Sequence, residues 1–130
     1  MSWQAYVDQS LIGSGNIDEA VICDGTGQTI WASSPNFALN AAEMSAIAAS
    51  FTDKSEPKAV ISNGIKIKGE KYMTIEASDD SVKAKKGKEG IVAFKTTQAL
   101  LIAHHNAEIQ TTNAFNSVAE LGEYLKKVGY

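Results

Sequence analysis

Both ends of the chain carry aromatic residues, and this feature restricts the possible folds more than any other. Trp3 and Tyr6 lie three residues apart near the start, and Tyr124 and Tyr130 lie near the end. Residues three apart share one face of a helix. Chain termini are usually poorly ordered unless packing holds them in place. We therefore predict that both ends form helices that pack together, with their rings along one shallow groove.

The last segment has the clearest helical pattern. Apolar residues recur at intervals of three and four, forming a stripe for burial: Ala114, Val118, Leu121, Leu125 and Val128. Tyr124 lies off this stripe, so a helix over residues 112–127 can fold without burying that ring. Ser2 is a candidate N-cap for a first helix that ends near Ile12. Asn40 and Glu43 have the spacing of a capping box, which predicts a second helix ending near Phe51.

The segments between the helices have strand and turn patterns. Strands are expected at 17–23, 29–32, 65–68, 71–77, 91–95 and 99–104, with a weaker, more polar candidate at 80–86. The turn Asp24-Gly-Thr-Gly27 joins the first two strands, and Gly69 joins the next two. This order predicts an α+β fold: a central antiparallel sheet of six to seven strands flanked by helices. The N- and C-terminal helices should pack together on one face.

The length and composition indicate a single domain over residues 1–130. The presence of only one cysteine fits a reducing compartment. The start has neither a basic region nor an apolar run, so we expect no signal peptide and a cytoplasmic location. Cys23 is the lone cysteine and cannot form an internal disulfide. All twelve basic residues are lysines. Because base-edge recognition usually uses arginine, sequence-specific nucleic-acid binding is not expected.

Several residues could suggest a catalytic or metal site, but their patterns argue against one. His104 and His105 are adjacent on a predicted strand, so their side chains should point to opposite faces. Cys23 lies in an apolar strand and should be a small buried side chain. Asp24-Gly-Thr-Gly27 lacks the lysine and the helix of a phosphate-binding loop. We expect no enzyme activity, cofactor or metal site.

Six motifs spread over the chain give it a resemblance to the profilin family. They are Met1-Ser-Trp-Gln-Ala-Tyr-Val-Asp8, Ile30-Trp-Ala32, Gly69-Glu-Lys-Tyr-Met73, Lys85-Lys-Gly-Lys-Glu-Gly90, Lys95-Thr-Thr-Gln-Ala99 and Leu121-Gly-Glu-Tyr-Leu125. The resemblance implies a monomeric protein of the cytoplasm and cytoskeleton that binds monomeric actin and regulates filament assembly. It also implies binding to poly-proline tracts, such as those of filament assembly factors, and to phosphoinositides.

The resemblance implies a poly-proline site made of aromatic residues. Its members in this chain are Trp3, Tyr6, Trp31, Tyr124 and Tyr130. Flat rings stack on pyrrolidines, and indole and phenol groups can donate hydrogen bonds to proline carbonyls. The alternative is that Trp3 and Trp31 are core residues, as in a small ligand-sensing or structural domain, because tryptophan is highly buried on average.

The resemblance also implies an actin-binding face on the later strands and the start of the last helix. Its members are Lys71, Lys85, Lys86, Lys95, Gln110, Asn113, Asn116 and Glu120. Glu76 and Asp80 replace arginines of many relatives, and Thr111-Thr112 replaces a common Pro-Gly. These departures leave open an alternative: a proline-binding adaptor whose actin affinity is weak or lost.

A lysine-rich tract runs from residue 83 to residue 88. Its lysines are Lys83, Lys85, Lys86 and Lys88. The resemblance implies that such a tract binds phosphoinositides and competes with actin. A solvated strand end is the alternative interpretation.

Overall fold

The computed structural model describes residues 3–35, 37, 39–54 and 59–130. The candidate cap Ser2 therefore lies outside the described residues. The helical elements are α1 (Trp3–Ala5), η1 (Tyr6–Leu11), η2 (Ile12–Ser14), α2 (Ala41–Ser50), α3 (Ala59–Asn63) and α4 (Thr111–Lys127). The strands are β1 (Glu19–Asp24), β2 (Ile30–Ser33), β3 (Ile65–Ile67), β4 (Glu70–Ala77), β5 (Ser81–Lys86), β6 (Glu89–Lys95) and β7 (Ala99–His105).

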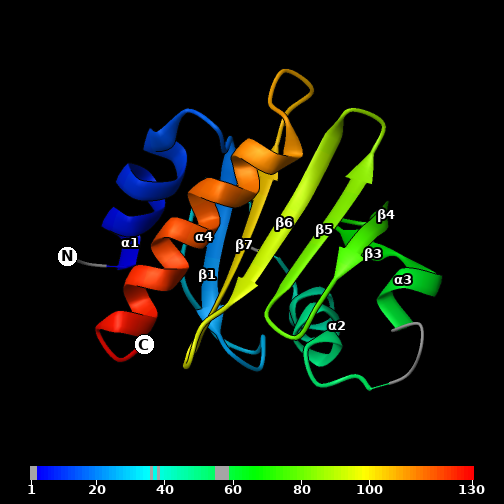
Figure 1. The fold of residues 1–130 in the computed structure, drawn as a ribbon, viewed down its shortest axis with the longest axis horizontal. Helices are drawn as coiled ribbons and strands as arrows, with labels where there is room; N and C mark the ends of the chain where they lie inside the picture. Colours follow the sequence, from blue (N-terminus) through cyan, green and yellow to red (C-terminus); the bar gives the residue numbers. More distant parts are fainter. Residues whose placement is uncertain (1–2, 36, 38, 55–58) are drawn as a thin grey trace.

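The strands form one seven-stranded sheet in the order β2-β1-β7-β6-β5-β4-β3 (Figure 1). Every neighbouring pair is antiparallel. The predicted α+β class and strand number are confirmed. The weak candidate at 80–86 is a regular strand, β5, because it pairs on both sides with β4 and β6.

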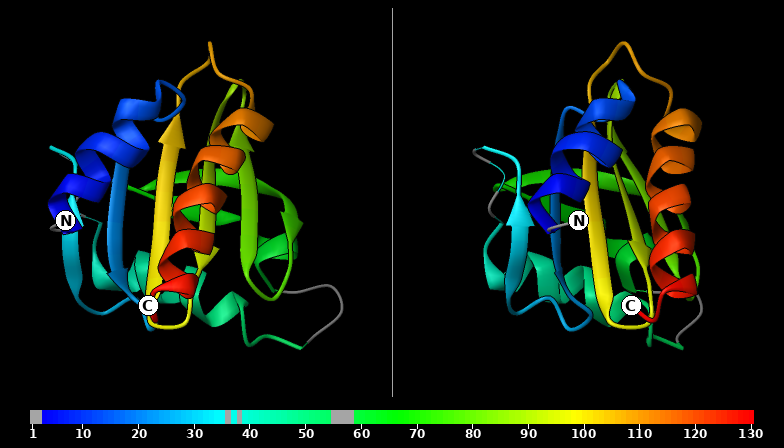
Figure 2. Two further views of the ribbon diagram at one scale, coloured as in Figure 1. Left: turned by 60° about the vertical axis from the view of Figure 1, so that its left-hand side comes forward. Right: turned by 90° about the vertical axis from the view of Figure 1, so that its left-hand side faces the viewer.

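Helices cover both faces of the sheet (Figure 2). The N-terminal helical segment and α4 pack together on one face, as predicted, over the buried side chains of Ile22, Val92 and Leu101. The shorter helices α2 and α3 cover the other face, where Ile91 and Ile102 are buried. Alternate side chains of each central strand therefore enter two separate cores. Among the described residues, no helix combines the length and the hydropathy needed to cross a bilayer.

Two local predictions at helix ends need correction. Asn40 does cap α2, because its side chain accepts a hydrogen bond from the Glu43 amide at 2.8 Å. The Glu43 carboxylate does not return to Asn40; it accepts from the amides of Lys68 and Gly69 and so ties α2 to the β3–β4 turn. Val128 was predicted to be in the buried stripe of α4. It lies just past the end of the helix and is 47% exposed.

Candidate functional site

Five aromatic rings from three parts of the chain lie in contact at the edge where the termini meet. We call them the aromatic platform: Trp3, Tyr6, Trp31, Tyr124 and Tyr130. The Trp3 ring is central, with its centroid 4.8 Å from Trp31, 5.1 Å from Tyr130 and 5.7 Å from Tyr6. Tyr6 in turn lies 6.2 Å from Tyr124. The chain ends thus meet side by side with β2.

The platform residues are partly buried or exposed, and none of them is fully buried in the core. Trp3, Tyr6 and Trp31 are half-buried and pack against the core beneath α4. Tyr124 and Tyr130 are 49% and 44% exposed. This contrasts with the interpretation of Trp3 and Trp31 as core anchors, since each residue is only partly buried.

Hydrogen bonds hold the platform elements in place. Gln4 donates from Nε2 to the carbonyl of Ser33, which joins the first helical segment to β2. At the other end, the Tyr130 carbonyl accepts from the Thr96 hydroxyl at 2.7 Å. Gln98 donates to the carbonyls of both Gly129 and Tyr130. These bonds order a chain end that would otherwise fray.

A hollow of about 440 Å³ continues the platform between the N-terminal helix and α4, with Tyr6, Glu120 and Tyr124 among its lining residues. Partial burial raises the pKa of Tyr6, and a hydrogen bond with Tyr124 raises it further. The Tyr6 phenol therefore stays protonated at neutral pH and keeps its hydroxyl group for polar contacts. The platform offers flat apolar area together with donors.

A second surface lies on the outer strands. Tyr72 of β4 and Ala84 of β5 point into the core beneath α2, so Lys71, Met73 and Lys85 project to the opposite side. We call Lys71, Met73, Ile75 and Lys85 the β4–β5 face. Met73 is 66% exposed and Ile75 is 57% exposed, which is unusual for large apolar side chains.

The β4–β5 face reaches the start of α4. Ile75 and Lys85 line a hollow of about 510 Å³ together with Gln110 and Thr112. A β-bulge between Thr74 and Glu76 places Ile75 out of register with β5. Basic, apolar and amide groups thus surround one concave surface.

Comparisons with known proteins identify the family. The profilin family model matches residues 1–130. The chain belongs to the profilin family. It is 44% identical to Profilin-A of Physarum polycephalum and 40% identical to Profilin of Schizosaccharomyces pombe, each over the full length of both proteins. Profilins are actin-binding regulators and not enzymes.

Solved profilin structures share this fold. The crystal structure of Acanthamoeba castellanii profilin II has a TM-score of 0.92 and 41% identity, covering 99% of this chain and 100% of that one. Mouse profilin IIa in complex with a double repeat from the FH1 domain of mDia1 has a TM-score of 0.80 over the whole of both chains. The sequence identity between this chain and mouse profilin IIa is 18%, so the similarity of these two structures supports the fold alone.

The structure separates the residues that the profilin resemblance assigned to actin. Lys71, Lys85 and Gln110 lie at the β4–β5 face, as described above. Lys86 points to the other side of the sheet, where it pairs with Glu70. Lys95 lines a hollow with Trp31 on the α2 side.

The assigned residues on α4 are also divided. Glu120 lines the hollow beside Tyr124, and Asn113 lies on the same helix edge because it is seven residues earlier. Asn116 is exposed on the outer side of the helix. The resemblance indicated which positions along the chain to consider. It could not show to which side of its strand or helix each side chain projects.

The two acidic departures from the family pattern have lysine partners. A carboxylate oxygen of Glu76 lies 3.7 Å from the Lys83 ammonium, and one of Asp80 lies 3.8 Å from that of Lys126. Lys83 also lies over the Phe115 ring at 4.5 Å. Each added negative charge is therefore offset locally.

The lysine-rich tract does not present one basic surface. Lys83 and Lys85 alternate with Lys86 along β5, so they project to opposite sides of the sheet. Lys88 follows in the exposed turn and lines the same hollow as Lys85. Lys85 and Lys88 therefore lie together, Lys83 on the same side is held by Glu76 and Phe115, and Lys86 lies on the other side.

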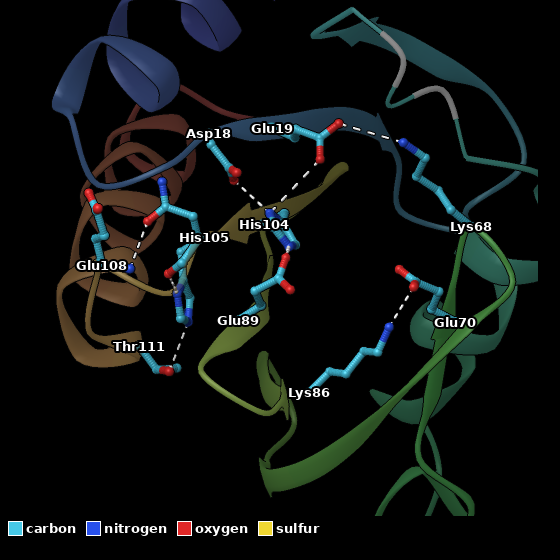
Figure 3. Close-up of polar contacts among 11 residues, drawn as sticks. Asp18, Glu19, Lys68, Glu70, Lys86, Glu89, His104, His105, Glu108 and Thr111 are labelled. Atoms are coloured by element: carbon cyan, nitrogen blue, oxygen red, sulfur yellow. Dashed lines mark hydrogen bonds and ion pairs between the residues drawn. The ribbon is translucent and has the colours of Figure 1, made fainter.

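The adjacent histidines point to opposite faces, as the strand pattern predicted. His105 contacts the Thr111 hydroxyl at 2.9 Å, on the α4 side. His104 lies on the other side among Asp18, Glu19 and Glu89 (Figure 3). The sequence did not reveal this cluster of acidic residues around His104, because the cluster depends on which residues of β1 pair with β7.

Proposed function

We propose that this protein binds monomeric actin and proline-rich segments on separate surfaces and thereby regulates actin filament assembly. The observation that carries the proposal is the aromatic platform: five rings from both termini and β2 that remain partly accessible. A proline-rich segment is already extended, so it loses little conformational entropy when it docks on such rings.

The platform geometry supports recognition of prolines. Trp3 contacts three other rings, so its removal would break the continuity of the surface. Proline carbonyls lack a neighbouring amide partner and need outside donors, which indole and phenol groups supply. The solved complex of mouse profilin IIa with an FH1 repeat is consistent with a partner of this class.

The substitution Trp3→Ala tests the proline site. We expect the variant to lose retention on a poly-proline column, while Trp3→Phe, which keeps a flat ring, retains part of the binding. Actin binding should be largely unchanged in both variants, which also controls for folding. If Trp3→Ala is retained as strongly as the unmodified protein, the platform is not the proline site.

The β4–β5 face supports the actin part of the proposal. Its exposed Met73 and Ile75 can lose contact with water in an interface, and each large apolar side chain contributes about 1.5–3 kcal/mol when fully buried. Lys71 and Lys85 beside them can pair with acidic groups of a partner. Charges at the rim of an interface mainly affect association rate and specificity.

Reversal of one charge on this face tests the actin site. We expect Lys71→Glu to weaken monomer binding about tenfold or more and to reduce the inhibition of pyrene-actin assembly, without affecting proline binding. Lys95→Glu makes the same charge change on the other side of the sheet and should have a smaller effect. Equal effects of the two variants would contradict the assignment of the β4–β5 face.

The alternative function is a proline-binding adaptor with little actin affinity. The exposed carboxylates of Glu76 and Asp80 beside this face favour it, although each has a lysine partner. Titration with monomeric actin distinguishes the two functions. Saturable binding supports the actin regulator, and its absence together with poly-proline retention supports the adaptor.

Phosphoinositide headgroups would compete with actin in this proposal. Lys85 and Lys88 line the hollow that also contains Gln110, so an anionic headgroup there would occupy part of the β4–β5 face. Each lysine near an anionic surface contributes about 1 kcal/mol. With Lys86 directed to the other side, we expect this modulation to be weak.

A further inference from the structure

A buried histidine lies among carboxylates where the start of β1, the end of β7 and the start of β6 lie side by side in the middle of the sheet (Figure 3). The Nδ1 atom of His104 is 2.6 Å from an oxygen of Asp18 and 3.9 Å from one of Glu19. Its Nε2 atom is 3.1 Å from an oxygen of Glu89. The His104 side chain is only 8% exposed, whereas the three carboxylates reach solvent.

The sheet register brings these groups together. Glu19 is the cross-strand partner of His104 in the β1–β7 pair, and Asp18 precedes it. The amide of Asp18 donates to the carbonyl of His104 at 3.0 Å, which fixes this part of the chain beside the ring. Main-chain pairing therefore holds the two carboxylates and the imidazole as one unit.

The number of protons on the His104 imidazole determines whether one of its ring nitrogens can bind a cation. A neutral imidazole carries one N–H, yet both ring nitrogens of His104 face carboxylate oxygens. The contact of 2.6 Å from Nδ1 to Asp18 is a short hydrogen bond in which Nδ1–H donates to the carboxylate. A metal ion at Nδ1 would replace this proton, which leaves to solvent, and the remaining ring proton on Nε2 would then donate to Glu89. A carboxylate behind the far nitrogen is the usual outer partner of a metal-binding histidine, because it fixes the tautomer and increases ligand basicity.

The surrounding charge also favours a cation. Four carboxylates surround the site, from Asp18, Glu19, Glu70 and Glu89, while only Lys68 and Lys86 bring positive charge through ion pairs. With a neutral ring, two negative charges remain uncompensated. Burial and these same four carboxylates raise the pKa of Tyr72, whose ring lies edge-on to His104, to about 12.

We propose that Asp18, Glu19 and His104 form a binding site for a divalent transition-metal ion of the Zn²⁺ class. Their ligand atoms all lie within 4.8 Å of one another. Bonds of about 2.0–2.2 Å to nitrogen and oxygen place the ligand atoms of one ion roughly 3.2–3.6 Å apart. The Asp18 oxygen, 2.6 Å from Nδ1, would therefore move slightly away from the ring, and the Glu19 oxygen, 3.9 Å from Nδ1, would move slightly closer. Three protein ligands leave the fourth position to water. This site does not depend on actin or proline binding.

Lys68 provides an internal test of the proposal. Its ammonium lies 3.7 Å from the second carboxylate oxygen of Glu19, so it competes with a cation for that ligand. Removing the lysine charge should increase metal affinity. A cluster that served only to hold the strands together would not show this gain.

The experiment is a calorimetric Zn²⁺ titration of the chelator-treated full chain near pH 7.5. We expect one ion per chain, at least tenfold weaker binding in Asp18→Asn and severalfold tighter binding in Lys68→Gln. Asp18 and Lys68 are partly exposed, so both variants should fold. Asp79→Asn, at a side chain 76% exposed and paired with Lys54, is the matched control and should bind as the unmodified protein does.

Nuclear magnetic resonance locates the ion, since the chain has two histidines. Zn²⁺ should shift the ring signals of His104 and leave those of His105, which faces Thr111, in place. Absence of saturable binding, equal affinity in Asp18→Asn and the unmodified protein, or perturbation of His105 instead of His104 would each overturn the proposal.

Discussion

At the scale of single residues, the surroundings of each side chain decide its role. Trp31 is only partly buried and joins the platform, whereas Phe37 is buried in the core on the α2 side. Cys23 is also fully buried, and burial raises the pKa of its thiol to about 12. The apolar strand around Cys23 predicted this burial correctly. The thiol is therefore a packing group and not a nucleophile.

The buried thiol and the buried phenol of Tyr72 predict a loss of stability in alkali. Their pKa values rise from 9.0 and 10.0 to about 12, so the unfolded chain ionises first and stability falls between about pH 9 and 12. We expect the free energy of unfolding to drop by a few kcal/mol, on the order of one per pH unit for each group. Urea unfolding at pH 8 and pH 10.5 measures the change.

The variant Cys23→Ala serves as the control for this prediction. It removes one of the two groups, so its stability should decline less steeply with pH, although it starts lower because a small cavity replaces the sulfur. The same decline in both proteins would show that the thiol does not contribute.

Strand alternation explains which residue-scale features the sequence could predict. It placed His104 and His105 on opposite faces, and the structure agrees. It could not show which acids surround His104, because Asp18 is 86 residues away in the chain. The bulge beside Ile75 likewise changes the side on which the following residues lie, and no local pattern indicated it.

At the scale of elements, the contact of α4 with the sheet supports both surfaces. Gly122 lets the helix approach Phe94 of β6, since a Cβ at this glycine would lie 2.3 Å from a ring carbon. The same helix carries Tyr124 to the platform and places Gln110 beside the β4–β5 face. The apolar stripe predicted the helix. The requirement for glycine at position 122 comes from the packing of α4 against Phe94, which no local pattern shows.

The substitution Gly122→Ala should therefore destabilise the protein although alanine is the better helix former. The helix gain is about 1 kcal/mol, while overpacking costs about 1–3 kcal/mol and displaces the helix. We expect a lower midpoint in urea unfolding and weaker poly-proline binding. The double variant Gly122→Ala with Phe94→Leu should recover part of the loss, and a stability gain in the single variant would contradict the packing argument.

Element boundaries show where local patterns were insufficient. The spacing of Asn40 and Glu43 predicted the start of α2, and the cap is present. The Glu43 carboxylate instead binds the β3–β4 turn, because those amides lie close in the folded chain. The polar strand β5 was hard to recognise for a related reason: its stability comes from pairing on both sides.

At the scale of the whole molecule, the two surfaces occupy different parts of the sheet. The platform lies where the chain ends meet β2, at one edge of the strand order, and the β4–β5 face lies toward the other (Figure 1). A proline-rich partner and an actin monomer should therefore bind at the same time. Simultaneous binding would let the protein bring actin to a proline-rich assembly factor at a high effective concentration.

Capture of monomeric actin on poly-proline beads tests this account most directly. We predict that actin is retained only when the protein is present, in a ratio near one to one, and that Lys71→Glu stays on the beads but captures much less actin. If the protein binds the beads and actin still passes through, or if actin releases the protein from them, the two surfaces are not separate sites.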